Sequence, residues 1–165
     1  MTIGNHLSNL AELGSLLKEG RHIEQVGAIC KRERTAGEPE VLLITTRETR
    51  RWTVPKGWPI KGLKAHKVAE REAWEEAGVV GKAKKKPYGR FTYVKTLKSG
   101  ERVASFVQVH LVRVADMEDD FPELGERERV WVSPSEAARM VPEPELKLLL
   151  SSLVAKDTAV ATATI

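Results

Sequence analysis

Cysteine is almost absent from this chain, which has one such residue, Cys30, among 165. A single thiol excludes an internal disulfide and a cysteine-rich zinc site, and it is compatible with a reducing compartment. Long hydrophobic runs are also missing, because polar residues interrupt the leucines of residues 1–20. A signal peptide or a membrane span needs an uninterrupted apolar core. We therefore expect a soluble, cytoplasmic protein that makes no contact with membranes.

Two kinds of reactive centre find no support in the sequence. No serine or cysteine stands in a recognisable nucleophile setting. The histidines do not form a set with metal-ligand spacing; they are His6, His22, His66 and His110. The sequence therefore gives no sign of a histidine metal centre or of a covalent nucleophile.

Charge is present in a pattern that points to an anionic ligand. The net charge is only +4, but basic residues gather in segments 31–34, 47–67 and 82–86. Such clusters can attract a polyanion. Each of them also has the simpler interpretation of a solvated surface, since Lys and Arg are mostly exposed.

The order of predicted elements indicates a single α/β domain with a mixed sheet between helices, a size for which 165 residues suffice. Asn9 and Glu12 have the spacing of a capping box, which predicts a short helix ending near Gly20. Further helices are predicted at 64–77, from Ser133 onward, and at 145–154. Strand-like composition marks residues 25–31, 40–46, 52–54, 88–97, 103–114 and 130–132. Residues 157–165 have no periodicity, which favours disorder or loose edge pairing.

The helix predicted at 64–77 contains the most informative residues. Glu72 lies three and four positions before Glu75 and Glu76, so the three carboxylates share one helical face. Their mutual repulsion would be relieved by a divalent cation, and hard oxygen ligands suit Mg²⁺ or Mn²⁺. Arg71 lies four residues before Glu75 and can orient a neighbouring carboxylate. Gly57 has no side chain, so it allows the backbone to approach a metal ion or substrate closely.

A cluster of helical glutamates taken alone more often marks a solvated face. The wider spacing argues against that interpretation here. Six specified residues, each of which has a usage of roughly one in fifteen, coincide by chance at about 10⁻⁷ per position. They are Gly57, Arg71, Glu72, Glu75, Glu76 and Gly78.

Together with the aliphatic residues Ala73 and Val79, this segment resembles the Nudix box. The resemblance implies a Nudix α/β/α sandwich with a central catalytic helix. It further implies a metal site formed by Glu72, Glu75, Glu76 and the carbonyl of Lys56. The box departs from the family pattern at position 63, where Leu63 replaces a glutamate that supports the metal site. On this basis we divide the chain into an N-terminal helical arm (1–20), a Nudix hydrolase domain (21–155) and a flexible C-terminal tail (156–165).

Outside the box, the run from residue 47 to 57 resembles diphosphoinositol polyphosphate and diadenosine polyphosphate hydrolases. The resemblance implies that Arg47, Arg51, Lys56 and Gly57 contact the substrate, although ordinary surface charge remains the alternative for the three basic residues. Trp58 replaces part of the usual glycine-rich loop. We expect it to pack under the helix, with stacking on a substrate base as the alternative.

These features predict a pyrophosphohydrolase in which Arg71, Glu72 and Glu75 are the catalytic residues and Mg²⁺, or Mn²⁺, is the cofactor. The expected substrate is a phosphorylated small molecule, such as a diadenosine polyphosphate or a diphosphoinositol polyphosphate. We expect no nucleic-acid partner except RNA with a capped or triphosphorylated 5′ end. A Nudix-fold nucleotide sensor without turnover is the alternative function, and the oligomeric state is left open. The acidic loop at 116–128 can supply a further carboxylate, which spacing alone does not identify.

Overall fold

The structure is a computed structural model that describes the chain over residues 3–34 and 37–163. Four helices are present: α1 (Ile3–Lys18), α2 (Ala65–Ala77), α3 (Pro134–Met140) and α4 (Pro144–Ala163). The strands are β1 (His22–Arg32), β2 (Glu40–Thr45), β3 (Trp52–Thr53), β4 (Lys56–Gly57), β5 (Val79–Ala83), β6 (Gly89–Thr96), β7 (Arg102–Met117) and β8 (Arg129–Val132). No helix in this described part of the chain is both long and apolar enough to cross a membrane.

One mixed sheet of eight strands forms the centre of the molecule. Its main path runs β3-β2-β1-β7-β5, while β4 pairs with β1, β6 with β7, and β8 with β2. The central pair, β1 and β7, is parallel from His22 opposite Ala104 to Lys31 opposite Arg113. The other pairings are antiparallel.

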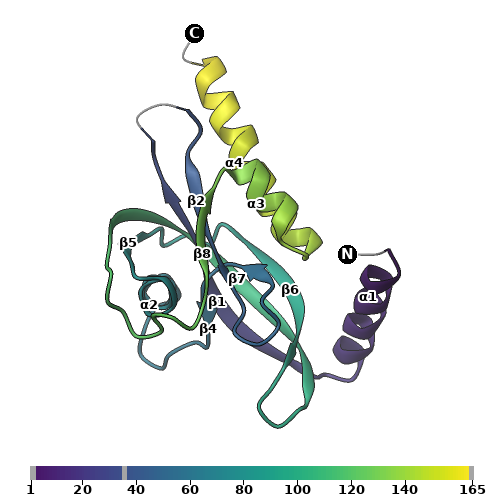
Figure 1. The fold of residues 1–165 in the computed structure, drawn as a ribbon. Coiled ribbons are helices and arrows are strands. Elements are labelled where there is room, and N and C mark those ends of the chain that lie inside the picture. Colours follow the sequence, from purple (N-terminus) through teal and green to yellow (C-terminus); the bar gives the residue numbers. More distant parts are fainter. Residues whose placement is uncertain (1–2, 35–36, 164–165) are drawn as a thin grey trace.

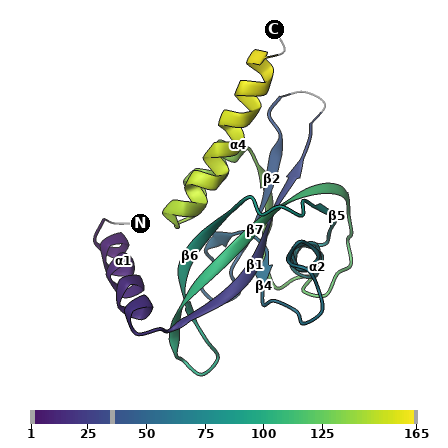
Figure 2. The same ribbon diagram turned by 180° about the vertical axis from the view of Figure 1, so that it is seen from behind.

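Helices cover both faces of this sheet, with α2 on one face and α3 and α4 on the other (Figures 1 and 2). Alternation along β1 divides the core, because Ile29 packs with α3 and α4 whereas Ala28 and Cys30 pack with α2. In β2, Leu43 lies in the first cluster, and its two neighbours lie in the second. The predicted α/β/α sandwich with a mixed sheet is confirmed.

Helix α2 follows the prediction to within one residue, and the other elements differ mainly at their ends. Gly78 ends α2 with a left-handed conformation at φ 73°, as the glycine at that position predicted. The strand β5 was not predicted, because Gly81 and Lys82 dilute its β-type composition. Residues 56–57 were predicted as loop but form β4 against β1.

The two terminal predictions need correction. The capping box at Asn9 was wrong, because α1 already begins at Ile3, and the Glu12 carboxylate instead accepts a hydrogen bond from Arg102 Nη2 at 2.7 Å. Residues 157–163 continue α4 as helix, whereas the sequence favoured an aperiodic tail from 157 onward. The flexibility of that tail and the three-part domain division remain predictions.

Candidate active site

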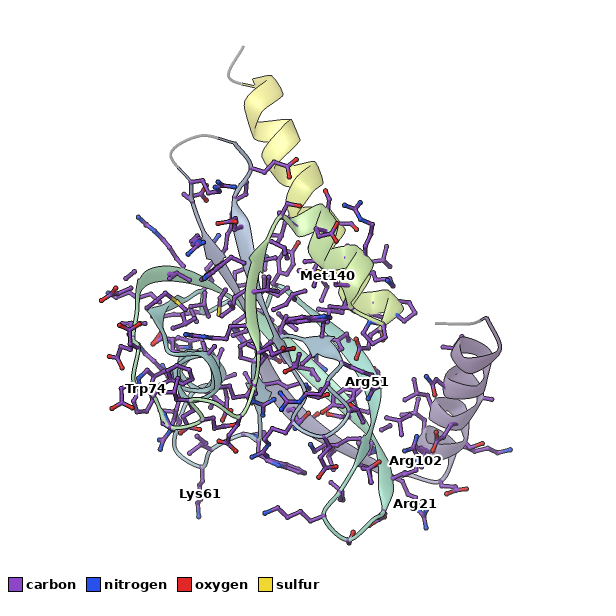
Figure 3. The ribbon with its side chains drawn as sticks, viewed as in Figure 1. Arg21, Arg51, Lys61, Trp74, Arg102 and Met140 are labelled. Atoms are coloured by element: carbon purple, nitrogen blue, oxygen red, sulfur yellow. The ribbon has the colours of Figure 1, made fainter. Side chains whose placement is uncertain are left out.

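A large cavity of about 1510 Å³ opens beside the sheet, and residues from distant parts of the chain line it. Its walls come from α1, the loop after β2, the segment from β4 to Ile60, α2, β6 with the following hairpin turn, the loop before β8, and the α3–α4 connection. In Figure 3, Arg51 and Arg102 lie on the side of the molecule that faces α1, whereas Trp74 lies on the far side of α2.

Two of the three glutamates predicted on α2, Glu72 and Glu76, line this cavity. A methyl group added at Gly57 would stand 2.3 Å from the Glu72 carboxyl carbon, so glycine is required for this close approach. The backbone N–H of Lys56 donates a hydrogen bond to Glu76 Oε2 at 3.3 Å. The strand β4 thus lies directly against the acidic face of α2. The close approach of Gly57 to a metal ion or substrate stays a prediction.

The ionisation of both cavity glutamates is disfavoured. Burial raises the pKa of Glu72 to about 7, and the charges of Glu75 and Glu123 act in the same direction. Burial likewise raises the pKa of Glu76 to about 7, although Arg127 and Lys56 oppose the change. A cation bound between these carboxylates would therefore stabilise their charged forms.

Glu75 lies apart from the cavity wall and is engaged by Arg71. Arg71 Nε donates a hydrogen bond to Glu75 Oε1 at 2.9 Å, the contact expected from their spacing of four residues. Because Glu75 is turned toward Arg71, no three His, Cys, Asp or Glu side chains within the described residues are already gathered as a metal-binding group.

The donor chemistry nevertheless fits a hard divalent ion. Glu72 and Glu76 both line the cavity, and the Glu72 carboxylate lies close against Gly57. Their carboxylate oxygens are the type of ligand that a hard divalent ion prefers. A change of rotamer would release Glu75 from Arg71, since the pair is on a partly exposed surface. Lys56, whose carbonyl is the other ligand that the family resemblance implies, also lines the cavity.

Arg127 is a site residue that the sequence did not reveal. Its side chain is only 10% exposed, and its Nη2 lies 3.6 Å from Glu76 Oε1 and 3.2 Å from Glu123 Oε1. Its Nη1 donates to the Thr45 carbonyl at 3.0 Å. The neighbouring Arg129 instead donates a hydrogen bond to the Ala77 carbonyl at the end of α2. Only the folded loop distinguishes these two arginines.

The acidic loop supplies one carboxylate to the cavity. Of its described side chains, Glu123 lines the cavity, and its backbone N–H donates to the Glu75 carbonyl at 3.0 Å. Glu118 instead accepts a hydrogen bond from Trp74 Nε1 at 2.7 Å. The loop conformation, which spacing could not give, thus brings Glu123 beside the α2 glutamates.

The three basic residues predicted to bind substrate all line the cavity. Arg47 Nη1 lies 3.5 Å from Glu126 Oε1. Arg51 Nε donates a hydrogen bond to Thr49 Oγ1 at 3.3 Å. Lys56 Nζ donates to Thr53 Oγ1 and lies 5.0 Å from the centre of the Tyr93 ring. Burial lowers the pKa of Lys56 to about 8, against the influence of Glu76 and Glu143.

Lys95 on β6 joins this basic wall, although no motif singled it out. It lines the cavity, and its ammonium group makes no hydrogen bond or ion pair to any other residue that the structure describes, although its backbone lies in the β6–β7 ladder opposite Val103. Burial lowers its pKa, and the nearby charge of Arg47 lowers it further. An unpaired, partly buried ammonium group of this kind is suited to an anionic ligand.

The expectation that Trp58 packs under the helix was wrong. Its side chain is 49% exposed and lines the cavity in the loop that leaves β4. An exposed aromatic ring at a cavity wall offers a stacking surface.

Nothing in the described structure takes over the place of the missing box glutamate. Leu63 is 36% exposed and lines a second, smaller cavity of about 210 Å³. His66 is buried on α2 and does not line the main cavity. Lys64 occupies the N-cap of α2, makes no side-chain capping bond, and is followed by no acidic residue in the first turn. The start of α2 therefore lacks the negative charge that helix N-termini favour.

A buried carboxylate closes the cavity at the α3–α4 connection. Glu143 lies between Pro142 and Pro144, and all three residues line the cavity. Glu143 Oε2 is buried and has no hydrogen-bond partner among the described residues. Burial raises the pKa of this carboxyl group, whereas Lys56 and Arg51 lower it.

The arrangement combines an acidic wall on α2 with a basic wall on β6 and the loop after β2. The first can hold divalent cations and the second can hold phosphate oxygens. A polyphosphate placed between them would lie next to the cation site.

Comparison with known proteins places the chain in a family context. The family model described as the NUDIX domain matches residues 21–150. Solved structures with a similar fold include a C. elegans Ap4A hydrolase, at a TM-score of 0.58 and 22% identity, over 81% of this chain and 96% of that chain. The MutT protein from Methanosarcina mazei Go1 gives a TM-score of 0.56 and 19% identity, over 83% and 96%. The E. coli ORF135 protein gives 0.53 and 24%, over 89% and 96%. No curated protein sequence matches significantly.

Proposed function

This chain belongs to the Nudix family, and from that premise we propose that it is a pyrophosphohydrolase that hydrolyses a diphosphate linkage in a nucleoside or inositol polyphosphate. The observation that carries the proposal is the cavity with carboxylates of α2 on one wall and basic side chains opposite. A neutral or purely acidic cavity would not hold a polyphosphate. The opposed charges suit a substrate whose phosphates are partly neutralised by cations.

The proposed cofactor is Mg²⁺, with Mn²⁺ as the alternative, held by Glu72, Glu75, Glu76 and the Lys56 carbonyl. When bound, the divalent ion neutralises phosphate charge and lowers the pKa of a coordinated water molecule. Glu76 is held in place by the Lys56 N–H and by Arg127. Arg71 positions Glu75 from outside the cavity.

Phosphate binding is assigned to Arg47, Arg51, Lys56 and Lys95, with Gly57 giving close access beside Glu72. Guanidinium groups form paired hydrogen bonds with phosphate oxygens, and lysine contributes a compact charge. The Ap4A hydrolase among the structural neighbours supports a diadenosine polyphosphate as one candidate. The basic run at 47–57 supports a diphosphoinositol polyphosphate as the other.

We also propose that the protein acts in the cytoplasm on small phosphorylated molecules. Cys30 supports this location, since a buried free thiol whose pKa burial raises to about 12 needs no oxidising compartment. Among nucleic acids, only a capped or triphosphorylated RNA 5′ end carries the diphosphate linkage that the proposed chemistry requires.

One observation favours a second function, a Nudix-fold sensor that binds nucleotides without turnover. Leu63 replaces the box glutamate, and no described side chain substitutes for it. The retained glutamates of α2 support the hydrolase over the sensor.

The decisive experiment is chromatographic detection of the hydrolysis products of dinucleoside polyphosphates, nucleotide sugars, diphosphoinositol polyphosphates and 5′-triphosphorylated RNA, with and without Mg²⁺. Wild type should turn over at least one substrate only with metal, and Glu75→Gln should lose that activity. Glu136→Gln is the matched control, because Glu136 pairs with Arg139 on α3 and does not line the cavity. Metal-dependent binding of the same ligands without any turnover would establish the sensor instead.

A further inference from the structure

The α3–α4 connection fixes a carboxylate rigidly in the cavity wall. Pro142 and Pro144 restrict the backbone on both sides of Glu143. The Glu143 carbonyl accepts a hydrogen bond from the Lys147 N–H at 3.0 Å, which places residue 143 at the start of α4. The side chain is therefore presented by a well-defined backbone and not by a loose loop.

This carboxylate has an acceptor atom that the protein leaves unsatisfied. Among the described residues, Glu143 Oε2 is the buried side-chain oxygen or nitrogen without a hydrogen-bond partner. A buried acceptor without a donor is costly, and such groups in native proteins commonly mark a functional role. The terminal torsion of glutamate is roughly two-fold, so a half-turn of the carboxylate exchanges its two oxygens and would bring the unsatisfied one to the cavity wall.

The position of Glu143 also limits which part of a substrate can lie beside it. Its negative charge disfavours a phosphate group, whereas an N–H or O–H donor would complete its hydrogen bonding. Two of the proposed phosphate-binding cations, Lys56 and Arg51, also act on Glu143, so the phosphates and the group that meets this carboxylate must be neighbours in the substrate. The part of the substrate near α4 should therefore be uncharged and rich in donors.

On the basis of the proposed function, we propose that Glu143 makes the enzyme select nucleoside polyphosphates over fully phosphorylated inositols, by accepting a hydrogen bond from the nucleoside. Adenine and guanine carry N–H donors, and ribose carries hydroxyl groups. A fully phosphorylated inositol has neither and would place a phosphate against the carboxylate. The exposed ring of Trp58 in the same cavity gives a base a second favourable contact.

The test is a binding titration with two ligands that the proposed reaction cannot consume. These are α,β-methylene-ADP and inositol hexakisphosphate, each titrated calorimetrically into the Mg²⁺-loaded protein at physiological ionic strength. Glu143→Gln should weaken binding of the nucleotide roughly fivefold, because the neutral amide oxygen of glutamine accepts a weaker hydrogen bond than the carboxylate. The same variant should bind inositol hexakisphosphate more tightly. Glu136→Gln on α3 should change neither affinity.

Unchanged affinity for both ligands in a folded Glu143→Gln protein would overturn the proposal. Folding is checked by thermal unfolding, and the variant should be at least as stable as wild type because an unpaired buried carboxylate is removed. Wild-type protein provides a second test that does not depend on the variant. Analogues of methylene-ADP that lack either the base amino group or both ribose hydroxyls should identify the donor, since one of them should bind about tenfold more weakly. Equal affinity for all three nucleotides would also overturn the proposal.

The proposed role of Glu143 and the proposed hydrolysis can be refuted separately. Absence of turnover on every diphosphate substrate would remove the proposed hydrolysis while leaving the nucleotide preference measurable. Turnover that favours diphosphoinositol polyphosphates and is unaffected by Glu143→Gln would leave hydrolysis intact and remove the role of Glu143.

Discussion

Replacement of Arg127 with methionine tests how the acidic wall of the cavity is stabilised. Arg127 contacts Glu76 and Glu123 and donates a hydrogen bond to the Thr45 carbonyl, with a side chain that is 10% exposed. Methionine can fill much of the same volume but offers no charge and no donor. The substitution therefore leaves the buried Glu76 without its cation.

The expected loss of stability at high pH follows from this geometry. Breaking a buried ion pair by removal of one partner costs about 3–5 kcal/mol, because a buried charge is left uncompensated. The unsatisfied Thr45 carbonyl adds about 1–3 kcal/mol. Since domains of this size are stable by roughly 5–15 kcal/mol, the variant should lose a third or more of its stability.

The loss should depend on pH in a definite direction. The pKa of Glu76 is raised from 4.5 to about 7 in the folded protein, so between those values the folded state holds a proton that the unfolded state has released. The stability that the folded state gains by holding this proton is fully present below about pH 4.5 and is lost as the pH rises through about 7. Arg127 lowers the pKa of Glu76, so its removal raises that pKa further and extends the window upward.

Urea unfolding at pH 5.5 and pH 8.5 measures the effect. The destabilisation by Arg127→Met should be smaller at pH 5.5, where Glu76 is protonated, and Mg²⁺ should restore part of the stability at pH 8.5. Arg139→Met is the control, because Arg139 pairs with Glu136 on an exposed surface of α3. A loss of equal size at both pH values, with no response to Mg²⁺, would refute the assignment of Arg127 as the counterion of Glu76.

Three further predictions follow from single contacts. Lys95→Ala should raise KM about tenfold and leave kcat nearly unchanged, since an unpaired cavity ammonium is lost; a change confined to kcat in steady-state kinetics would contradict this. Gly57→Ala should abolish metal-dependent turnover because its methyl group would meet the Glu72 carboxyl at 2.3 Å, whereas Gly14→Ala, with open space, should keep full activity. Lys64→Asp should stabilise the protein by about 1 kcal/mol, seen as a higher Tm, because α2 gains a capping carboxylate.

The sequence predicted best what depends on local chemistry. Helix α2 was placed within one residue, since its alanines and glutamates favour helix and Gly78 ends it. The contact between Arg71 and Glu75 followed from helical spacing.

What the sequence missed depends on how distant segments pack. Arg127 lies fifty residues after the glutamate it contacts, in a loop whose conformation no spacing rule gives. Nothing in the sequence marked Glu143, because its distinguishing feature is a buried Oε2 without a hydrogen-bond partner among the described residues. Only the packed structure reveals this. Trp58 was misplaced because large hydrophobic residues are usually buried, whereas this ring is 49% exposed.

The parallel pairing of β1 with β7 also has a consequence for how this protein folds. The two central strands are separated by about eighty residues of chain, so their contacts close a very large loop. Such non-local pairing slows folding. During synthesis at about 5–20 residues per second, β1 remains unpaired with β7 for several seconds. In that interval the apolar edge of β1 is exposed to aggregation or to chaperones. We expect nascent-chain pulse proteolysis to show protection of β1 only after β7 has left the ribosome.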